Sequence, residues 1–218
     1  MRKSVFFASL AAAFALVACN PERSPQADAS NGCPAEWKPE AGTRLVASLP
    51  TDSGMHGLWN PEAFKAVCDF DTWARNFVEE RDIRRHIAAG AFVPIYVHSD
   101  GAPLIDVRVG SAQAPATYEP VAQARVERRS QPYLLVSSGM VGISGIEYIN
   151  AYSDDGARFL KLPAGRWVAE ILEVEPQEGL DKELADKVPN FVVLLNPEPA
   201  QRPDYSQDVD TFSQSAPR

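Results

Sequence analysis

Short runs in which hydrophobic and polar residues alternate fill most of the chain after residue 90, and Gly, Pro, Asp and Ser separate them. Alternation with a period of two is typical of a strand that buries one face of a sheet. Short strands with turns at intervals of about ten residues predict an antiparallel sandwich or a partly open barrel. The strands expected from this pattern are 44–49, 92–98, 104–109, 121–128, 133–136, 141–149, 159–162, 167–174 and 191–195.

A helical pattern precedes most of these strands. Asn60-Pro61-Glu62 is typical of a helix start, because Asn accepts hydrogen bonds from free N–H groups and Pro fits the first turn. We expect a short helix from there to about Cys68, a second over 71–89, and a further short one over 179–187. The expected fold class is therefore α+β, mainly β, with one or two helices near the N-terminal side.

Three features refine the expected sheet. Ser99-Asp100-Gly101 stands between two of the predicted strands, which is typical of a β-hairpin. Pro94 lies inside the first of those strands and cannot donate an N–H, so it indicates an edge position or a bulge. The Gly- and Ser-rich segment 137–145 predicts either a bulged strand within the sheet or an edge that faces a partner.

The first residues have the pattern of a secretion signal. Two basic residues precede an apolar run from Val5 to Val17, which is too short to span a bilayer as a helix. Leu16-Val17-Ala18-Cys19 ends this run and resembles the lipobox of bacterial lipoproteins. The resemblance implies that residues 1–18 are a signal peptide and that Cys19 becomes the lipid-carrying N-terminus. The alternative is an ordinary signal peptide that happens to place a cysteine there.

The rest of the chain then divides into three parts. Residues 19–32 are rich in Pro, Ser and Ala and are expected to be a lipidated tether. Residues 33–196 are expected to form a single β-rich domain, and 197–218 a disordered tail. Asn20 follows Cys19, so an Asp-type inner-membrane retention signal is missing, which favours the periplasmic side of the outer membrane.

Two cysteines remain after lipidation, Cys33 and Cys68. An exported protein enters an oxidising compartment, so we expect these two to form a disulfide. Such a bridge closes a loop of roughly 35 residues and would stabilise the fold by about 3–4 kcal/mol. The alternative is two free thiols, although no Cys-x-x-Cys or mixed His and Cys spacing supports it.

The charge of the chain excludes one class of partner. The formal net charge is −8, and because residues 1–18 contribute +2, the remainder carries −10. A basic footprint for nucleic acid is therefore absent. Anionic headgroups would not attract such a chain, so only the lipid on Cys19 would hold it at a membrane. The acidic balance favours a basic partner or serves solubility alone.

Two histidines are candidates for chemistry. His56 lies in the Gly-rich stretch SGMHG close to Asp52 and Ser53, which suggests a Ser-His-Asp triad. A triad is assembled by geometry across a fold, and no Gly-x-Ser-x-Gly is present, so a histidine bonded to its own turn is favoured. His98 stands beside Asp100 as in a metal or catalytic cluster, but a turn accounts for that aspartate without any function.

The remaining candidates are weaker. Arg84 and Arg85 with His86 form either a binding patch or a complement to the negative end of a helix. Asp154-Asp155-Gly156 lacks the further oxygen ligands of a calcium loop, and no phosphate-binding glycine loop occurs. No catalytic, cofactor-binding or metal-binding residue is therefore predicted.

One resemblance bears on function. Leu162-Pro163-Ala164-Gly165-Arg166-Trp167 belongs to a second half of short strands and Gly-rich bends that resembles β modules of some bacterial immunity-type proteins. The resemblance implies a non-catalytic envelope protein that binds or inhibits another protein, and it assigns no site residues. Two alternatives stay open: a structural or assembly lipoprotein of an envelope machine, and a hydrolase of envelope polymers that uses His56 or His98.

Overall fold

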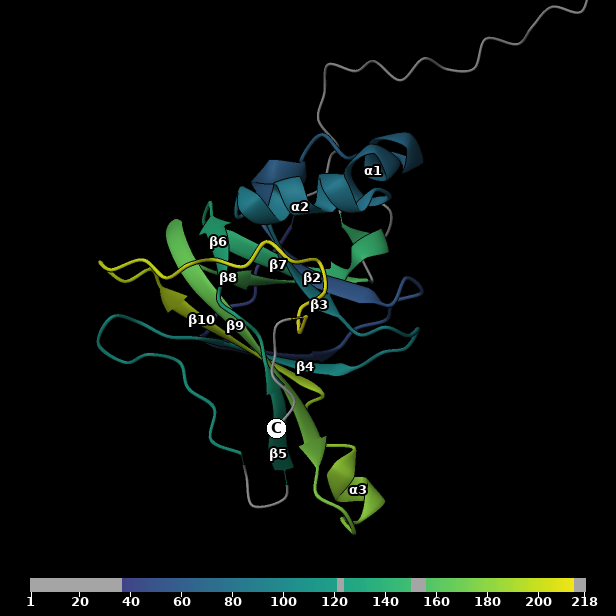
Figure 1. Cartoon of the computed structure of the whole chain (residues 1–218), viewed down its shortest axis with the longest axis vertical. Coiled ribbons are helices and arrows are strands. Elements are labelled where there is room, and N and C mark those ends of the chain that lie inside the picture. The colour runs from purple at the N-terminus through teal and green to yellow at the C-terminus, as the bar shows by residue number, and fades with distance from the viewer. Residues whose placement is uncertain (1–36, 121–123, 150–155, 214–218) are drawn as a thin grey trace, which may run out of the picture. The chain divides into compact units, whose positions relative to one another are not determined.

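Two β-sheets make up most of the molecule (Figure 1). The structure is a computed structural model that describes residues 37–120, 124–149 and 156–213. One sheet has six strands in the order β1-β4-β10-β9-β5, with β6 also paired to β9, and the other has the order β3-β2-β7-β8. This arrangement confirms the α+β, mainly β class with two packed sheets, and the strands described do not close a barrel.

Most strands lie where the alternating pattern predicts them, but β2 was not predicted and η2 replaces the end of the strand predicted over 141–149. The strands are β1 (Arg44–Ser48), β2 (Met55–Trp59), β3 (Phe92–Tyr96), β4 (Leu104–Val109), β5 (Ala124–Arg129), β6 (Tyr133–Ser137), β7 (Met140–Gly145), β8 (Ala157–Lys161), β9 (Gly165–Pro176) and β10 (Phe191–Pro197). The helices are η1 (Pro61–Phe64), α1 (Phe70–Phe77), α2 (Glu80–Ala88), η2 (Ile146–Tyr148) and α3 (Lys182–Ala185).

Side chains cap the starts of η1, α1 and α3. Asn60 accepts a hydrogen bond from Glu62 N–H at the start of η1, as expected. Asp69 and Thr72 form a capping box for α1, so that helix starts earlier than expected. The segment predicted as one helix over 71–89 is two helices, α1 and α2, because the chain turns at Val78-Glu79.

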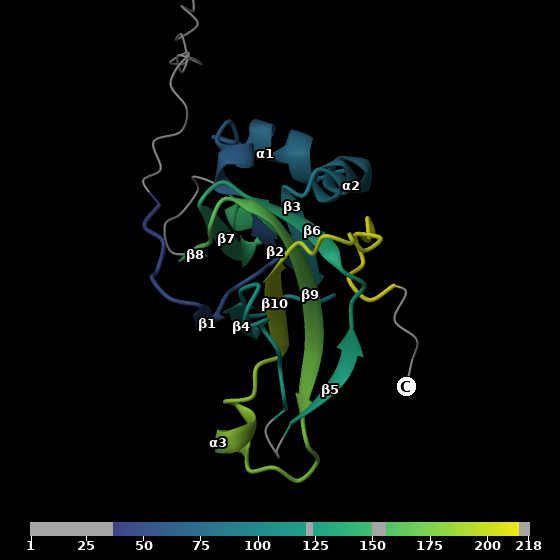
Figure 2. The same cartoon turned by 90° about the vertical axis from the view of Figure 1, so that its left-hand side faces the viewer.

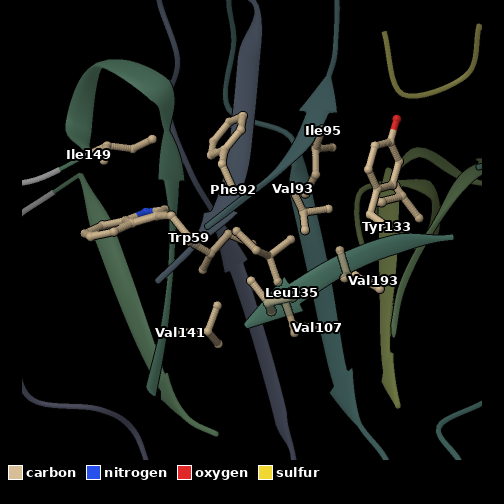
Figure 3. Close-up of a cluster of buried hydrophobic side chains, with 14 of the residues drawn as sticks. Trp59, Phe92, Val93, Ile95, Val107, Tyr133, Leu135, Val141, Ile149 and Val193 are labelled. Carbon is tan, nitrogen blue, oxygen red and sulfur yellow. The ribbon is translucent and has the colours of Figure 1, made fainter. Parts of the chain in front are cut away.

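The main core lies between the two sheets (Figure 3). Trp59 and Phe92 are fully buried there. A Cβ at Gly142 would lie 2.5 Å from the Trp59 ring, and one at Gly57 would lie 2.0 Å from the Phe92 ring. These glycines therefore make room for aromatic side chains.

The register of β7 with β2 and with β8 is continuous, so the residues of 137–145 in β7 form neither a bulge nor an edge. The prediction of a partner-facing edge there is wrong.

The predicted hairpin at Asp100-Gly101 does not form. β3 and β4, which flank it, belong to different sheets. Gly101 instead exchanges backbone hydrogen bonds of 2.8 and 3.0 Å with Thr51, and the N–H groups of Val97 and His98 both donate to Gly54 O. The turn is thus bound to the loop before β2, and the chain crosses from one sheet to the other. The prediction of an edge position for Pro94 is confirmed, because β3 is an outermost strand.

The segment after β10 packs against the domain, contrary to the disorder expected from residue 197 onward. Residues 198–213, yellow in Figure 1, run across the sheets toward β3. Val209 and Phe212 are buried in the main core, and Tyr133 Oη donates to Asp208 O at 3.0 Å. The few apolar residues of this segment are spaced irregularly, so the sequence has no helical or strand periodicity that would predict their burial.

One pair of strands is parallel within the otherwise antiparallel six-stranded sheet. β10 runs parallel to β4 with Phe191 opposite Ile105. The outer face of this sheet carries a second apolar cluster, against which Ala116, Tyr118 and Leu180 pack from the loop before β5 and the segment before α3. That cluster consists of Ala124, Leu172, Val174, Val188, Val192 and Leu194. β1 lies at the end of the sheet, beyond β4.

Several predictions fall on residues that the structure does not describe. Cys19, the tether 19–32 and Cys33 lie outside the described residues, and so do Asp154 and Asp155. Cys68 lies between η1 and α1, and its disulfide with Cys33 stays a prediction. Within the described ranges, no helix is long and apolar enough to cross a membrane.

Candidate functional site

His56 is a core residue of the four-stranded sheet. It lies in β2, opposite Ile95 of β3 and Gly145 of β7, and is fully buried. Its Nε2 donates to Leu49 O at 2.7 Å, and its Nδ1 has no hydrogen-bond partner among the described residues. Burial lowers the pKa of His56, so the ring is held neutral. A side chain in this position cannot reach a substrate.

The triad that SGMHG suggested does not form. Ser53 Oγ donates to Glu147 Oε2 at 3.0 Å, while the N–H of Asp52 donates to Glu147 Oε1 at 2.6 Å. Thr51 Oγ1 donates to the same carboxylate at 3.2 Å. Glu147 therefore fastens the loop before β2, and neither Ser53 nor Asp52 contacts His56 through a hydrogen bond.

His98 is separate from His56. Its backbone has a φ of 58°, a left-handed conformation that bends the chain out of β3 toward β4. The ring lies 4.0 Å from the Tyr96 ring centroid, and Nε2 lies 3.7 Å from Asp210 Oδ1. The side chain is half exposed at the surface, whereas His56 lies in the core, so the two do not share a cleft.

The third histidine and its neighbours stabilise helices. His86 Nε2 lies 2.9 Å from Asn76 Oδ1, and burial lowers the pKa of this ring. Arg84 donates to Glu80 and Arg85 to Asp82 within α2. The structural interpretation of this basic stretch therefore fits better than a binding patch. In the described part of the chain, no group of His, Cys, Asp and Glu side chains could hold a metal ion.

Five strands lie at an edge, because β5 and β6 both pair with the same side of β9, and other parts of the chain contact three of these edges, at β3, β8 and β6. At β6, Val136 N–H donates to Gly90 O at 2.8 Å. At β3, Pro94 lacks an N–H, and Thr211 Oγ1 accepts from Tyr96 N–H at 2.9 Å and donates to Pro94 O at 3.0 Å. At β8, Glu40 receives and returns backbone hydrogen bonds with Phe159 and Lys161. These contacts occupy the backbone groups that a foreign strand would need.

The edge of β5 is protected by charge and by a bulge. The register between β5 and β9 shifts between Val126 and Arg128. Each arginine of this strand has a glutamate partner on β9, and a bulged, charged edge resists pairing with another strand. The ion pairs are Arg125–Glu175, Arg128–Glu173 and Arg129–Glu170.

The edge of β1 has none of these devices. Leu49 N–H donates to Pro103 O and Val109 N–H donates to Thr43 O, so the odd-numbered residues of this strand turn their backbone groups toward β4. The backbone groups of Arg44, Val46 and Ser48 therefore point away from the sheet. Among the described residues, no other strand pairs with them. Figure 2 shows β1 at the margin of the sheet, beside β4.

A charged cluster lies on the outer face beside this edge. Asp106 of β4 is only 1% exposed, and its carboxylate binds two guanidinium groups. Arg44 donates through Nε and Nη2 at 2.8 and 3.0 Å, and Arg108 donates through the same two atoms at 3.0 and 2.9 Å. The Arg108 guanidinium also lies 4.8 Å from the Tyr118 ring centroid. We call Arg44, Asp106, Arg108 and Tyr118 the Asp106 cluster.

The Asp106 cluster has a surplus of one positive charge, since one carboxylate serves two guanidinium groups. The hydrogen bonds to Asp106 raise the pKa of Arg44, which therefore stays charged. The Arg44 side chain is still 60% exposed, because it spans from the edge strand to the buried acid. The candidate functional site is therefore the uncovered edge of β1 together with this cluster.

Sequence reasoning missed this site. The alternation in LIDVRV signals that Asp106 and Arg108 share one face of a strand. It does not reveal that Arg44, 62 positions away, comes to lie beside them, because strand neighbours are decided by tertiary packing.

The chain is similar to two solved structures. No protein-family model matches it, and no curated protein matches it in sequence. The first structure, "Crocagin biosynthetic gene J", has 19% identity and a TM-score of 0.48 over 72% of this chain and 100% of that chain. The second is ComJ from Bacillus subtilis, an inhibitor of the DNA degrading activity of NucA, with 12% identity and a TM-score of 0.40 over 72% of this chain and 96% of that chain. Both similarities are too weak to decide the function.

Proposed function

We propose that this chain is a lipid-anchored protein of the bacterial cell envelope that binds another protein, as inhibitor or immunity-type proteins do, and that it catalyses no reaction. The lipobox ending at Cys19 supports the anchor and the export. The periplasmic side of the outer membrane is the proposed location, since Asn20 follows the lipidated cysteine.

The observation that carries the binding role is the uncovered edge of β1. An unpaired row of N–H and C=O groups is a template for another strand, and soluble proteins normally block such edges. Among the described residues, β3, β8 and β6 are contacted by other parts of the chain and β5 is bulged and charged, whereas β1 presents Arg44 and the exposed Val46. An edge left open, while the four other edge strands are contacted or charged, supports a partner that pairs there.

The hydrolase alternative has less support. His56 lies in the core with its Nε2 bound to a backbone carbonyl, and the carboxylate near the loop before β2 serves that loop. A general base must come within about 3 Å of the proton that it removes, which a fully buried ring cannot do.

A pull-down tests the proposed function. The lipidated protein is used as bait on detergent-solubilised envelopes, and a Cys19→Ala variant is the control for the anchor. A single stoichiometric partner, retained at moderate salt, is expected. Its identity separates the two binding roles, since a toxin or enzyme indicates an inhibitor and an assembly complex indicates the structural alternative. An empty pull-down from well-folded bait would contradict both.

The anchor is tested separately. Mass spectrometry of the purified protein is expected to find a mature N-terminus at Cys19 with attached acyl chains, and membrane fractionation is expected to find the protein with the outer membrane. The Cys19→Ala variant should lose the acyl mass and leave the membrane fraction. Retention of residues 1–18, or a lipid-free Cys19, would contradict the anchor.

A further inference from the structure

We infer that the partner enters as an extended segment that adds a strand to β1 and places a carboxylate against Arg44. The inference rests on the proposed protein-binding function and names the mode of binding and the chemistry of the partner. Strand addition is a recurring way in which a sheet edge recognises a peptide, with backbone hydrogen bonds for affinity and alternate side chains for specificity.

The backbone of β1 is prepared for this pairing. Arg44, Val46 and Ser48 each turn one N–H and one C=O outward, and the strand has neither a proline nor a register shift. The opposite side of β1 is held along its whole length by β4, so the edge is already extended before a partner arrives. Preorganisation of this kind reduces the entropy that binding costs.

The side chains of β1 indicate how a partner strand would lie. Leu45 faces the core, while Val46, at the centre of the strand, is on the outer face and 46% exposed. A residue directly opposite Val46 on an added strand would come within about 5 Å of it, which favours a β-branched or aromatic neighbour. The apolar contact is small, so charge would have to contribute to the choice of partner.

The local charge at Arg44 selects an acidic segment, in contrast to the basic partner that the net charge of −8 favours for the chain as a whole. Arg44 uses Nε and Nη2 for Asp106, and Nη1 has no hydrogen-bond partner among the described residues. The buried Asp106 holds this guanidinium in place, and the cluster retains one net positive charge. An ordered arginine with an unused donor suits a carboxylate, because the two planar groups match in geometry.

The edge strand β5 differs in this respect. There each arginine is paired with its own glutamate, so the ion pairs balance and no positive charge is left over. An acidic strand would therefore gain no comparable charge contact from the other end of the six-stranded sheet.

A second copy of the chain fits the edge less well. If two β1 strands paired antiparallel about Val46, Arg44 of each would face Ser48 of the other. That pairing supplies no carboxylate to Arg44. Self-association through β1 is therefore an outcome that would contradict the inference.

The experiment is an NMR titration of the full-length protein, purified in detergent from envelopes. The probes are short peptides of alternating Thr and Val that differ only in a central Glu, Gln or Lys. We expect the Glu peptide to shift the outward amides of Arg44, Val46 and Ser48 more than the inward amides of Leu45 and Ala47. We expect it to bind at least about tenfold more tightly than the Lys peptide.

Two variants separate the backbone contribution from the charge contribution. Val46→Pro removes an outward N–H and should abolish binding of all three peptides, whereas Val46→Thr is the matched control and should retain it. Arg44→Gln should retain weak binding but lose the preference for Glu over Lys. Circular dichroism of each variant confirms that the sheet is intact.

Several results would overturn the inference. Equal affinity for the Glu and Lys peptides would contradict an acidic partner. Amide shifts that are confined to β5, or the absence of any shift, would contradict strand addition at β1. Shifts of the β1 amides that depend on protein concentration alone would indicate a second copy. A pull-down partner that Val46→Pro still retains would contradict this edge and leave the proposed function standing. An empty pull-down would contradict the function whatever the peptides do.

Discussion

The edge strands β1 and β3 have the same length, but the described chain covers the edge of β3 and leaves the edge of β1 open. Each is an outermost strand of five residues, one in the six-stranded sheet and one in the four-stranded sheet. Pro94 and Thr211 leave β3 without a free row of donors and acceptors, whereas β1 keeps its row. This chain can close an edge with one of its own side chains, as Thr211 does at β3. The contrast therefore indicates that the open edge of β1 is a specific feature of the fold.

The two edges also differ in what surrounds them. β3 is covered by residues 198–213, which follow the last strand of the opposite sheet and so fasten both sheets together. On the outer face, Asp106 holds the Arg44 side chain of β1 in place without covering the backbone of that strand. The first arrangement stabilises the fold, and the second prepares a surface.

The largest expected effect comes from opening the β3 side. Phe212 is buried, stacks on Phe191 with ring centroids 6.5 Å apart, and lies 4.4 Å from the Arg128 guanidinium. Phe212→Ala is expected to lower the free energy of unfolding by about 3–5 kcal/mol, measured by denaturant titration. The control is Phe70→Ala, whose ring is 65% exposed and should cost less than about 1 kcal/mol. Equal losses in the two variants would show that 198–213 does not stabilise the domain.

A pair of prolines distinguishes the two sides of β1. Ala47 turns its N–H toward β4, so Ala47→Pro is expected to cost about 3 kcal/mol or more in the free energy of unfolding. Val46 turns its N–H away from the sheet, so Val46→Pro should cost less than about 1 kcal/mol. Thermal and denaturant unfolding measure both. A large loss for Val46→Pro would mean that the edge is paired after all.

The next effect concerns the hydroxyl that closes β3. Thr211→Val keeps the shape but leaves Tyr96 N–H without its acceptor and Pro94 O without its donor. We expect a loss of about 1–3 kcal/mol in the free energy of unfolding. Thr211→Ser keeps the hydroxyl and should recover most of this loss. If Thr211→Ser were as unstable as Thr211→Val, the methyl group and not the hydrogen bonds would account for the closure.

A smaller and graded effect is expected from acidification. Burial lowers the pKa of His56 and of His86 below the value of about 6.5 that histidine has in an unfolded chain. Between the two values the unfolded chain binds more protons, so the free energy of unfolding falls as the pH drops below about 6.5 and is unaffected above it. Each ring contributes at most about 1.4 kcal/mol per pH unit.

Denaturant titrations at about pH 7.5 and about pH 5.5 measure this slope. A His86→Gln variant keeps a polar group opposite Asn76 without a titrating ring, and it should show a shallower slope. An unchanged slope in that variant would exclude His86 as a contributor.

Sequence patterns predicted the features that have local causes. The alternation marked most of the strands, Asn60 capped the helix start that its type favours, and Pro94 came to lie on an edge. Each of these follows from the geometry of a few neighbouring residues. The same reasoning placed His56 in a loop and bonded to its own turn, whereas His56 lies in β2 and its ring donates to Leu49 O.

The features it missed depend on distant partners. Asp100-Gly101 has hairpin composition, yet Gly101 pairs with Thr51 because two loops meet where the sheets approach each other. The tail resembled a disordered segment, yet Thr211 and Phe212 find partners 117 and 21 positions earlier. The same limit applies to the candidate site, since its edge and its cluster exist only once β1 and β4 are side by side.

The parallel ladder between β4 and β10 determines when this chain can fold. It joins Ile105 to Phe191, 86 positions apart, and β10 is the last strand. Sheets closed by such distant contacts fold in about milliseconds to seconds, because the loop must close before its contacts form. The six-stranded sheet therefore cannot be completed on a nascent chain that lacks its final quarter. A polypeptide that stays unfolded until late in its synthesis can still cross a membrane as an extended chain. This matches the export that residues 1–18 predict.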